Sequence, residues 1–175
     1  MPKVSIDQHN LACIHEAAHA IIFHLMGFEV ARAVALMPEA RVRRDLGETV
    51  YFASESRSPK DTEKLAIGMC AGYVAELIHY YGIERFEGED VIQLCNRDGG
   101  YEAGYAHHLC HFDLGEDAFE DVITKTKRLL QAPNIAMSVF ELAALLHRYG
   151  TANYFQILTI TRHNGLIPIP HKEWP

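Results

Sequence analysis

Two histidines and a glutamate near the N-terminus have the spacing of a zinc site. Residues 15–19 read H-E-A-A-H, which is the H-E-x-x-H pattern. In an α-helix, residues four apart share a face, so the imidazoles of His15 and His19 can bind one zinc ion. Glu16 then stands beside a zinc-bound water and can act as general base, passing the proton to a leaving amine. The alternative at this point is a pair of solvent-facing or core histidines on an amphipathic helix, with no metal.

The third zinc ligand does not follow from local spacing. A metzincin pattern needs glycine and histidine where this chain has Ile22 and Leu25. The residue four beyond His19 is Phe23, and His24 lies one step off the face that carries the motif. The third ligand is therefore expected to be a distant carboxylate or histidine.

The element that must position the motif is a helix over residues 7–26. Asp7 can cap its start, and Gly27 supplies a left-handed stop. Apolar residues nearly surround this helix, which predicts a central helix instead of a surface one.

The rest of the chain predicts one mostly α (α+β) domain over residues 1–175. Two strands, 28–37 and 47–52, form a small β-hairpin inserted after the zinc helix. A helix capped by Ser58 continues to Tyr81, and two short helices within 83–112 are separated by a break near residues 98–100. Helices follow over 116–131 and 134–149, and residues 151–164 suit either a helix or a strand.

The composition excludes several classes of partner. The chain has 175 residues, 49% of them hydrophobic, and 16 basic against 23 acidic side chains give a net charge of -7. This balance disfavours nucleic acid and anionic membranes as partners. The longest apolar segment, residues 11–26, carries three histidines and a glutamate and is not expected to span a bilayer. Four cysteines without C-x-x-C pairing and no signal peptide predict a cytoplasmic protein with reduced thiols.

Three segments, taken in order, resemble the protease domain of the FtsH-type zinc metalloproteases. Residues 14–22 (I-H-E-A-A-H-A-I-I) resemble that family's zinc helix, whose usual form is H-E-A-G-H-A. Residues 30–52 resemble its hairpin, and residues 70–78 (C-A-G-Y-V-A-E-L-I) are similar to its A-G-R-x-A-E-E helix. The late pair of helices, which ends in residues 142–146 (L-A-A-L-L), also resembles helices of that family. The resemblance implies a helical metalloprotease domain that uses Zn²⁺ to hydrolyse peptide bonds in unfolded or flexible polypeptides.

The resemblance also suggests a third zinc ligand. In that family it is an aspartate at the start of a helix after the A-G-x-x-A-E segment. Asp98 in N-R-D is the preferred candidate, Asp90 the alternative and Glu102 the third choice; either aspartate could instead be a helix cap. Glu76 either orients a zinc-bound histidine or is a buried carboxylate with another partner.

The chain departs from the family in several ways that bear on function. Ala18 replaces a glycine, Tyr73 an arginine and Leu77 the second glutamate of A-E-E. The length leaves no room for an AAA+ ATPase, so the expected substrates are flexible polypeptides or proteins delivered by a separate ATPase or delivery partner. Because members of that family assemble into rings, the resemblance also suggests a homo-oligomer.

The competing hypothesis is a non-catalytic regulatory or interaction domain that keeps the fold, with or without a structural zinc. A third is a helical bundle in which the motif arose by chance.

Overall fold

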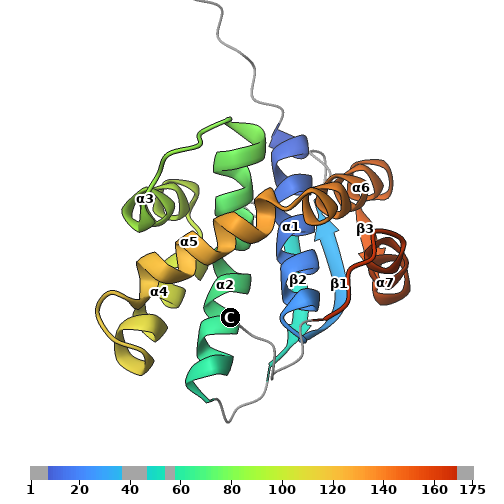
Figure 1. Ribbon diagram of the computed structural model, residues 1–175. Coiled ribbons are helices and arrows are strands. Elements are labelled where there is room, and N and C mark those ends of the chain that lie inside the picture. Colours follow the sequence, from blue (N-terminus) through green and yellow to red (C-terminus); the bar gives the residue numbers. More distant parts are fainter. Residues whose placement is uncertain (1–7, 37–46, 54–57, 169–175) are drawn as a thin grey trace, which may run out of the picture.

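Helix α1 (Gln8–Leu25), which carries the H-E-x-x-H motif, runs through the middle of the molecule. The computed structural model describes residues 8–36, 47–53 and 58–168. Helix α1 packs against α2 (Pro59–Ala75), against a small sheet and against α6 (Pro133–Tyr149) (Figure 1). Of its 18 residues, 14 are buried, which confirms the predicted central helix. The helix is followed by Gly27 with φ 87°, as predicted, whereas the predicted cap Asp7 lies outside the described residues.

The sheet has three antiparallel strands in the order β2-β1-β3. Strands β1 (Glu29–Ala35) and β2 (Gly47–Phe52) confirm the predicted hairpin, whose connecting residues lie outside the described part. Strand β3 (Thr151–Asn153) was not expected as a partner of β1. The ambiguous segment 151–164 contains both structures, because Asn153 ends this strand and its side chain caps helix α7 (Tyr154–His163).

Helix α2 begins as predicted and ends in an unusual turn. Ser58 and Asp61 form a reciprocal capping box, with Pro59 in the first turn. Beyond Ala75 the chain continues as a π-helical segment, η2 (Glu76–Tyr80), before Gly82 with φ 66°. Such wide turns are rare and are frequently found at functional sites. Here the turn begins at Glu76, whose side chain is buried.

The remaining helices confirm the predicted break near residues 98–100 but place Asp98 differently from the prediction. They are α3 (Gly88–Asp98), α4 (Glu102–Asp113) and α5 (Ala118–Gln131), followed by α6. Asp98 was expected to begin the helix over residues 99–111, but it is the last residue of α3. Gly99 takes a left-handed conformation (φ 78°) that ends α3, and the next helix begins only at Glu102.

The buried apolar side chains form one cluster to which α1, α2, α4, α5 and α6 all contribute. This core holds the faces of α1 and α2 that carry the motif and the A-G segment against each other. In the described part of the chain, no helix alone is both long and apolar enough to cross a membrane. Helices α5 and α6 meet that criterion only when taken together, as a pair bent by 78°.

Candidate metal centre

The two histidines of the motif face each other between α1 and α2. Their Nε2 atoms are 2.9 Å apart. The Nδ1 atom of His15 lies 2.6 Å from Oε1 of Glu76 in the π-helical turn, and Nδ1 of His19 donates to the backbone carbonyl of Gly68 over 2.7 Å. Glu76 was predicted either to orient a histidine or to have another partner; in the structure it contacts His15.

The hydrogen bonds at the two Nδ1 atoms determine which roles remain for the two Nε2 atoms. A carbonyl oxygen only accepts, and an ionised carboxylate only accepts, so both Nδ1 atoms carry a hydrogen. In a neutral ring the Nε2 atom then has only a lone pair. Two lone pairs 2.9 Å apart repel unless a proton or a cation lies between them. The arrangement is therefore stable only with a positive charge between the two atoms, which either a proton or a metal ion can supply.

The same contacts determine which of the two histidines is protonated when no metal is bound. Burial lowers the pKa of His15, but the hydrogen bond to Glu76 and the negative charges of three glutamates outweigh it, so that the pKa is raised. Burial and the charge of His15 lower the pKa of His19. In the absence of metal, His15 therefore carries the proton that joins the two rings, and a metal ion must displace it.

Gly72 provides the space that the imidazoles occupy. A Cβ atom at this position would lie 2.5 Å from Nε2 of His15 and 2.5 Å from Nε2 of His19. Any larger side chain would push the rings away from their present positions. This gives a physical reason for a glycine in the A-G segment of α2, one turn after the carbonyl of Gly68 that holds His19.

Glu16 has the environment of a general base. Its side chain is buried, and its Oε2 accepts a hydrogen bond of 2.8 Å from the hydroxyl of Thr49 on β2. Burial raises the pKa of Glu16 to about 7, against the opposing effects of the His15 charge and the Thr49 hydrogen bond. A carboxyl group that titrates near neutrality is well matched to accepting and returning a proton.

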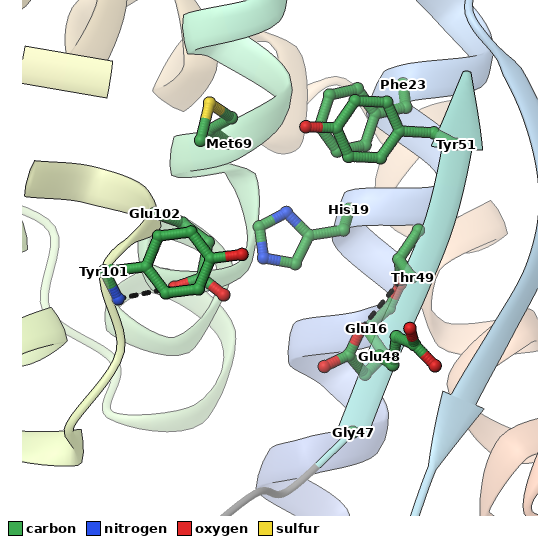
Figure 2. A pocket seen from close by; sticks show the side chains of 10 residues that line it. All are labelled: Glu16, His19, Phe23, Gly47, Glu48, Thr49, Tyr51, Met69, Tyr101 and Glu102. Atoms are coloured by element: carbon green, nitrogen blue, oxygen red, sulfur yellow. Dashed lines mark hydrogen bonds between the residues drawn. The ribbon is translucent and has the colours of Figure 1, made fainter. Parts of the chain in front are cut away.

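Glu102, the first residue of α4, is a carboxylate that lines the same cavity as His19, as does Glu48 on β2. The Oε2 atom of Glu102 accepts hydrogen bonds from the backbone N–H of Tyr101 at 3.0 Å and from the hydroxyl of Tyr73 at 3.3 Å. Burial raises the pKa of Glu102, but the helix-start N–H groups and the charges of His19 and His15 outweigh this effect and lower it. Figure 2 shows His19 and Glu102 on opposite sides of one cavity, with their polar ends turned toward it.

Asp98 and Asp90, which the sequence favoured over Glu102 as the third ligand, do not line this cavity. Asp98 accepts a hydrogen bond of 3.1 Å from Arg97 at the end of α3, and it does not line the cavity. Asp90 caps the start of α3 by accepting from the backbone N–H of Glu87. The preference for Asp98 is therefore not supported by its position, because the helix expected to start there starts four residues later.

The cavity between α1, β2 and the start of α4 has a volume of about 300 Å³. Its lining is polar beside the motif, where Glu16, His19 and Glu102 lie, and apolar at one end, where Phe23, Tyr51 and Met69 lie (Figure 2). The Phe23 and Tyr51 rings stack with centroids 3.8 Å apart. The cavity thus has room for a small ligand or a short peptide segment next to His19.

The two imidazole nitrogens are donors of a type that zinc binds. Two Zn–N bonds of 2.0–2.1 Å at a tetrahedral angle place the nitrogens about 3.3 Å apart. The observed 2.9 Å between the Nε2 atoms is a few tenths of an ångström shorter. Across the described residues, no set of three or more histidine, cysteine, aspartate or glutamate side chains is already close enough to hold an ion. The structure thus brings His15 and His19 together and places Glu102 on the wall of the cavity that His19 lines.

Neither the models of known protein families nor the curated proteins contain a match to this chain. The interpretation of the site accordingly depends on its geometry and on the sequence motifs.

Proposed function

We propose that this protein is a zinc-dependent metallopeptidase that hydrolyses peptide bonds in flexible polypeptides. The observation that carries the proposal is the pair of Nε2 atoms held 2.9 Å apart, with a buried carboxylate, Glu16, on the same helix beside them. A structural zinc has no need of a buried carboxylate beside it at the edge of an open cavity. This combination favours the enzyme over a non-catalytic domain.

His15, His19 and Glu102 are the residues that would hold the zinc ion. When bound, the ion supplies Lewis acidity, which polarises a carbonyl group and lowers the pKa of a water molecule toward 7. Glu76 and the Gly68 carbonyl orient the two imidazoles through their Nδ1 hydrogens, and such partners commonly affect metal affinity by 10- to 100-fold.

Glu16 moves the proton in the proposed reaction. Its carboxylate takes a proton from the attacking water and returns it to the amine of the departing peptide. Thr49 fixes the orientation of Glu16 by donating to Oε2. Because Thr49 is on β2, the position of the base depends on the sheet as well as on α1.

The sheet also supports a polypeptide substrate. Strand β2 lies at one edge of the described sheet, and Gly47, Glu48, Thr49 and Tyr51 line the cavity. An extended chain can pair with such an edge through backbone hydrogen bonds. We further propose that the protein acts in the cytoplasm on segments that are already unfolded, or that a separate ATPase partner delivers.

The experiment that tests the function compares the wild type with Glu16→Gln. Both proteins are purified without an affinity tag, loaded with zinc and assayed with a library of quenched fluorescent peptides. We expect one equivalent of zinc in each, hydrolysis by the wild type, and loss of hydrolysis by at least 100-fold in the variant. Glu89→Gln, an exposed position on α3, is the matched control and should hydrolyse like the wild type.

Two outcomes would contradict the proposal. Equal hydrolysis by the wild type and Glu16→Gln would show that Glu16 is not the base. Less than half an equivalent of zinc after supplementation, together with no hydrolysis, would instead favour the regulatory domain.

A further inference from the structure

Helix α4 carries a row of exposed aromatic side chains. Tyr105 is 43% exposed and Phe112 is 70% exposed, and His108 between them is exposed as well. Tyr101, directly before the helix, is 72% exposed. Large aromatic side chains contribute strongly to interfaces, and a contiguous row of them on a surface usually marks a place of interaction.

These side chains lie on one face of the helix. At 100° per residue, Tyr105, His108 and Phe112 fall within about 60° of one another. The opposite face carries Ala103 and Ala106, which are buried in the core, as is Cys110. The helix thus packs into the core through one face, while Tyr105, His108 and Phe112 on the other face are exposed. We call the exposed residues Tyr101, Tyr105, His108 and Phe112 the aromatic stripe.

The aromatic stripe begins at the cavity. Tyr101 lines the cavity opposite β2 and beside Glu102 (Figure 2). The stripe ends at Phe112, whose ring lies 4.4 Å from that of His108. With a rise of 1.5 Å per residue, the eleven steps from Tyr101 to Phe112 cover about 16 Å, the length of about five extended residues.

We propose that the aromatic stripe binds the part of the polypeptide substrate that extends beyond the cavity. This inference rests on the proposed function, because the cavity defines where the substrate begins. The ligand is an unfolded polypeptide segment with aromatic or large aliphatic side chains about five residues from the scissile bond. Such side chains pack on exposed aromatic rings without requiring a defined sequence.

Continuity with the cavity favours a polypeptide over a membrane surface. A helix that lies on a membrane has basic residues along its polar face, whereas α4 contains no lysine or arginine and the chain has a net charge of -7.

The test measures binding and cleavage separately. Binding is measured by fluorescence anisotropy with the zinc-loaded Glu16→Gln protein, which is expected to bind peptides without cleaving them. One fluorescent peptide of six residues spans the cavity alone. Longer peptides add eight residues at either end, containing either two phenylalanines or two serines. The same peptides in quenched form report hydrolysis by the protein with Glu16 intact.

The variant is the double substitution Tyr105→Ser and Phe112→Ser, made with and without Glu16→Gln. Phe155→Ser, on α7 and 74% exposed, is the matched control. We expect the phenylalanine-containing extension at one end to bind about tenfold more tightly than the short peptide, and the double substitution to remove this gain. Binding of the short peptide and the melting temperature should be unchanged, and the control variant should behave like the wild type.

The proposal is overturned if the extension gives no gain in affinity, or if the gain survives the double substitution. It is also overturned if phosphatidylglycerol vesicles bind through the stripe while the extended peptides do not. Sedimentation that shows a dimer dissociating in the double variant, without an effect on peptides, would assign the stripe to a second copy. If the extended peptides bind through the stripe but no peptide is cleaved, the inference stands and the proposed enzymatic function fails.

Discussion

Replacing Gly72 by alanine tests whether the histidine pair is a metal site. The added methyl group would be centred 2.5 Å from both Nε2 atoms. An ordinary contact between carbon and nitrogen is about 3.5 Å, so each ring would have to retreat by roughly 1 Å. The rings resist this movement because the Nδ1 atoms are held by Glu76 and by the Gly68 carbonyl over 2.6 and 2.7 Å.

The size of the effect follows from this displacement. Zinc–nitrogen bonds tolerate changes of about 0.2 Å, so a shift of roughly 1 Å either breaks a bond or breaks an outer hydrogen bond. Loss of an outer partner alone commonly weakens metal binding 10- to 100-fold. We therefore expect Gly72→Ala to weaken zinc binding by at least about 100-fold, although alanine is the better helix former by about 1 kcal/mol.

The assay is a competition titration against a chromophoric chelator, together with thermal unfolding in the presence and absence of zinc. Gly104→Ala in α4 is the matched control, since a Cβ there meets nothing within 4 Å. This control should bind zinc like the wild type and gain stability from helix propensity. The reasoning is refuted if Gly72→Ala binds zinc as tightly as the control.

Three further predictions concern the neighbours of the motif and the pH dependence of stability. Glu76→Gln should weaken zinc binding about tenfold, measured by the same titration, because the amide is a weaker acceptor for the His15 imidazole. Glu102→Gln should weaken it at least tenfold while Asp98→Asn leaves it unchanged; the opposite result would restore Asp98 as the ligand. Burial and the charge of Arg162 lower the pKa of His24, so the unfolded chain binds the extra proton, and stability falls as the pH drops below about 6.5. Urea unfolding at pH 7.5 and 5.5 should show a smaller loss for His24→Gln than for the wild type, and equal losses would contradict this reasoning.

Local patterns were enough to predict most of the secondary structure. These patterns involve residues close together in the sequence. They are the apolar residues on nearly all sides of α1, the capping box at Ser58 and the left-handed glycines after α1 and α3. Strand β3 was missed because three residues carry no periodicity, and its pairing with β1 joins segments more than one hundred residues apart. The π-helical turn at Glu76 was missed as well, since its residues read as ordinary helix.

The choice between Asp98 and Glu102 shows where the local sequence is least informative. Asp98 and Glu102 are four residues apart, and the choice between them depends on where the chain stops being helical after α3. Gly99 and Gly100 both permit a break, and the predicted helix began at Gly99 whereas α4 begins at Glu102. A Cβ at Gly100 would clash with the Tyr73 hydroxyl, so the second glycine lets α4 approach α2. That contact lies between distant segments, and the local sequence does not reveal it.

Tyr73 links this approach to the position of Glu102. Its ring packs edge-on to His15 with centroids 4.6 Å apart, and its hydroxyl donates to Glu102. The tyrosine thus contacts one proposed zinc ligand with its ring and another with its hydroxyl. Glu102 in turn starts the helix that carries the aromatic stripe, next to Tyr101. A polypeptide that binds along the stripe would therefore contact the helix that begins with Glu102. Substrate binding and zinc binding would then both depend on the position of α4.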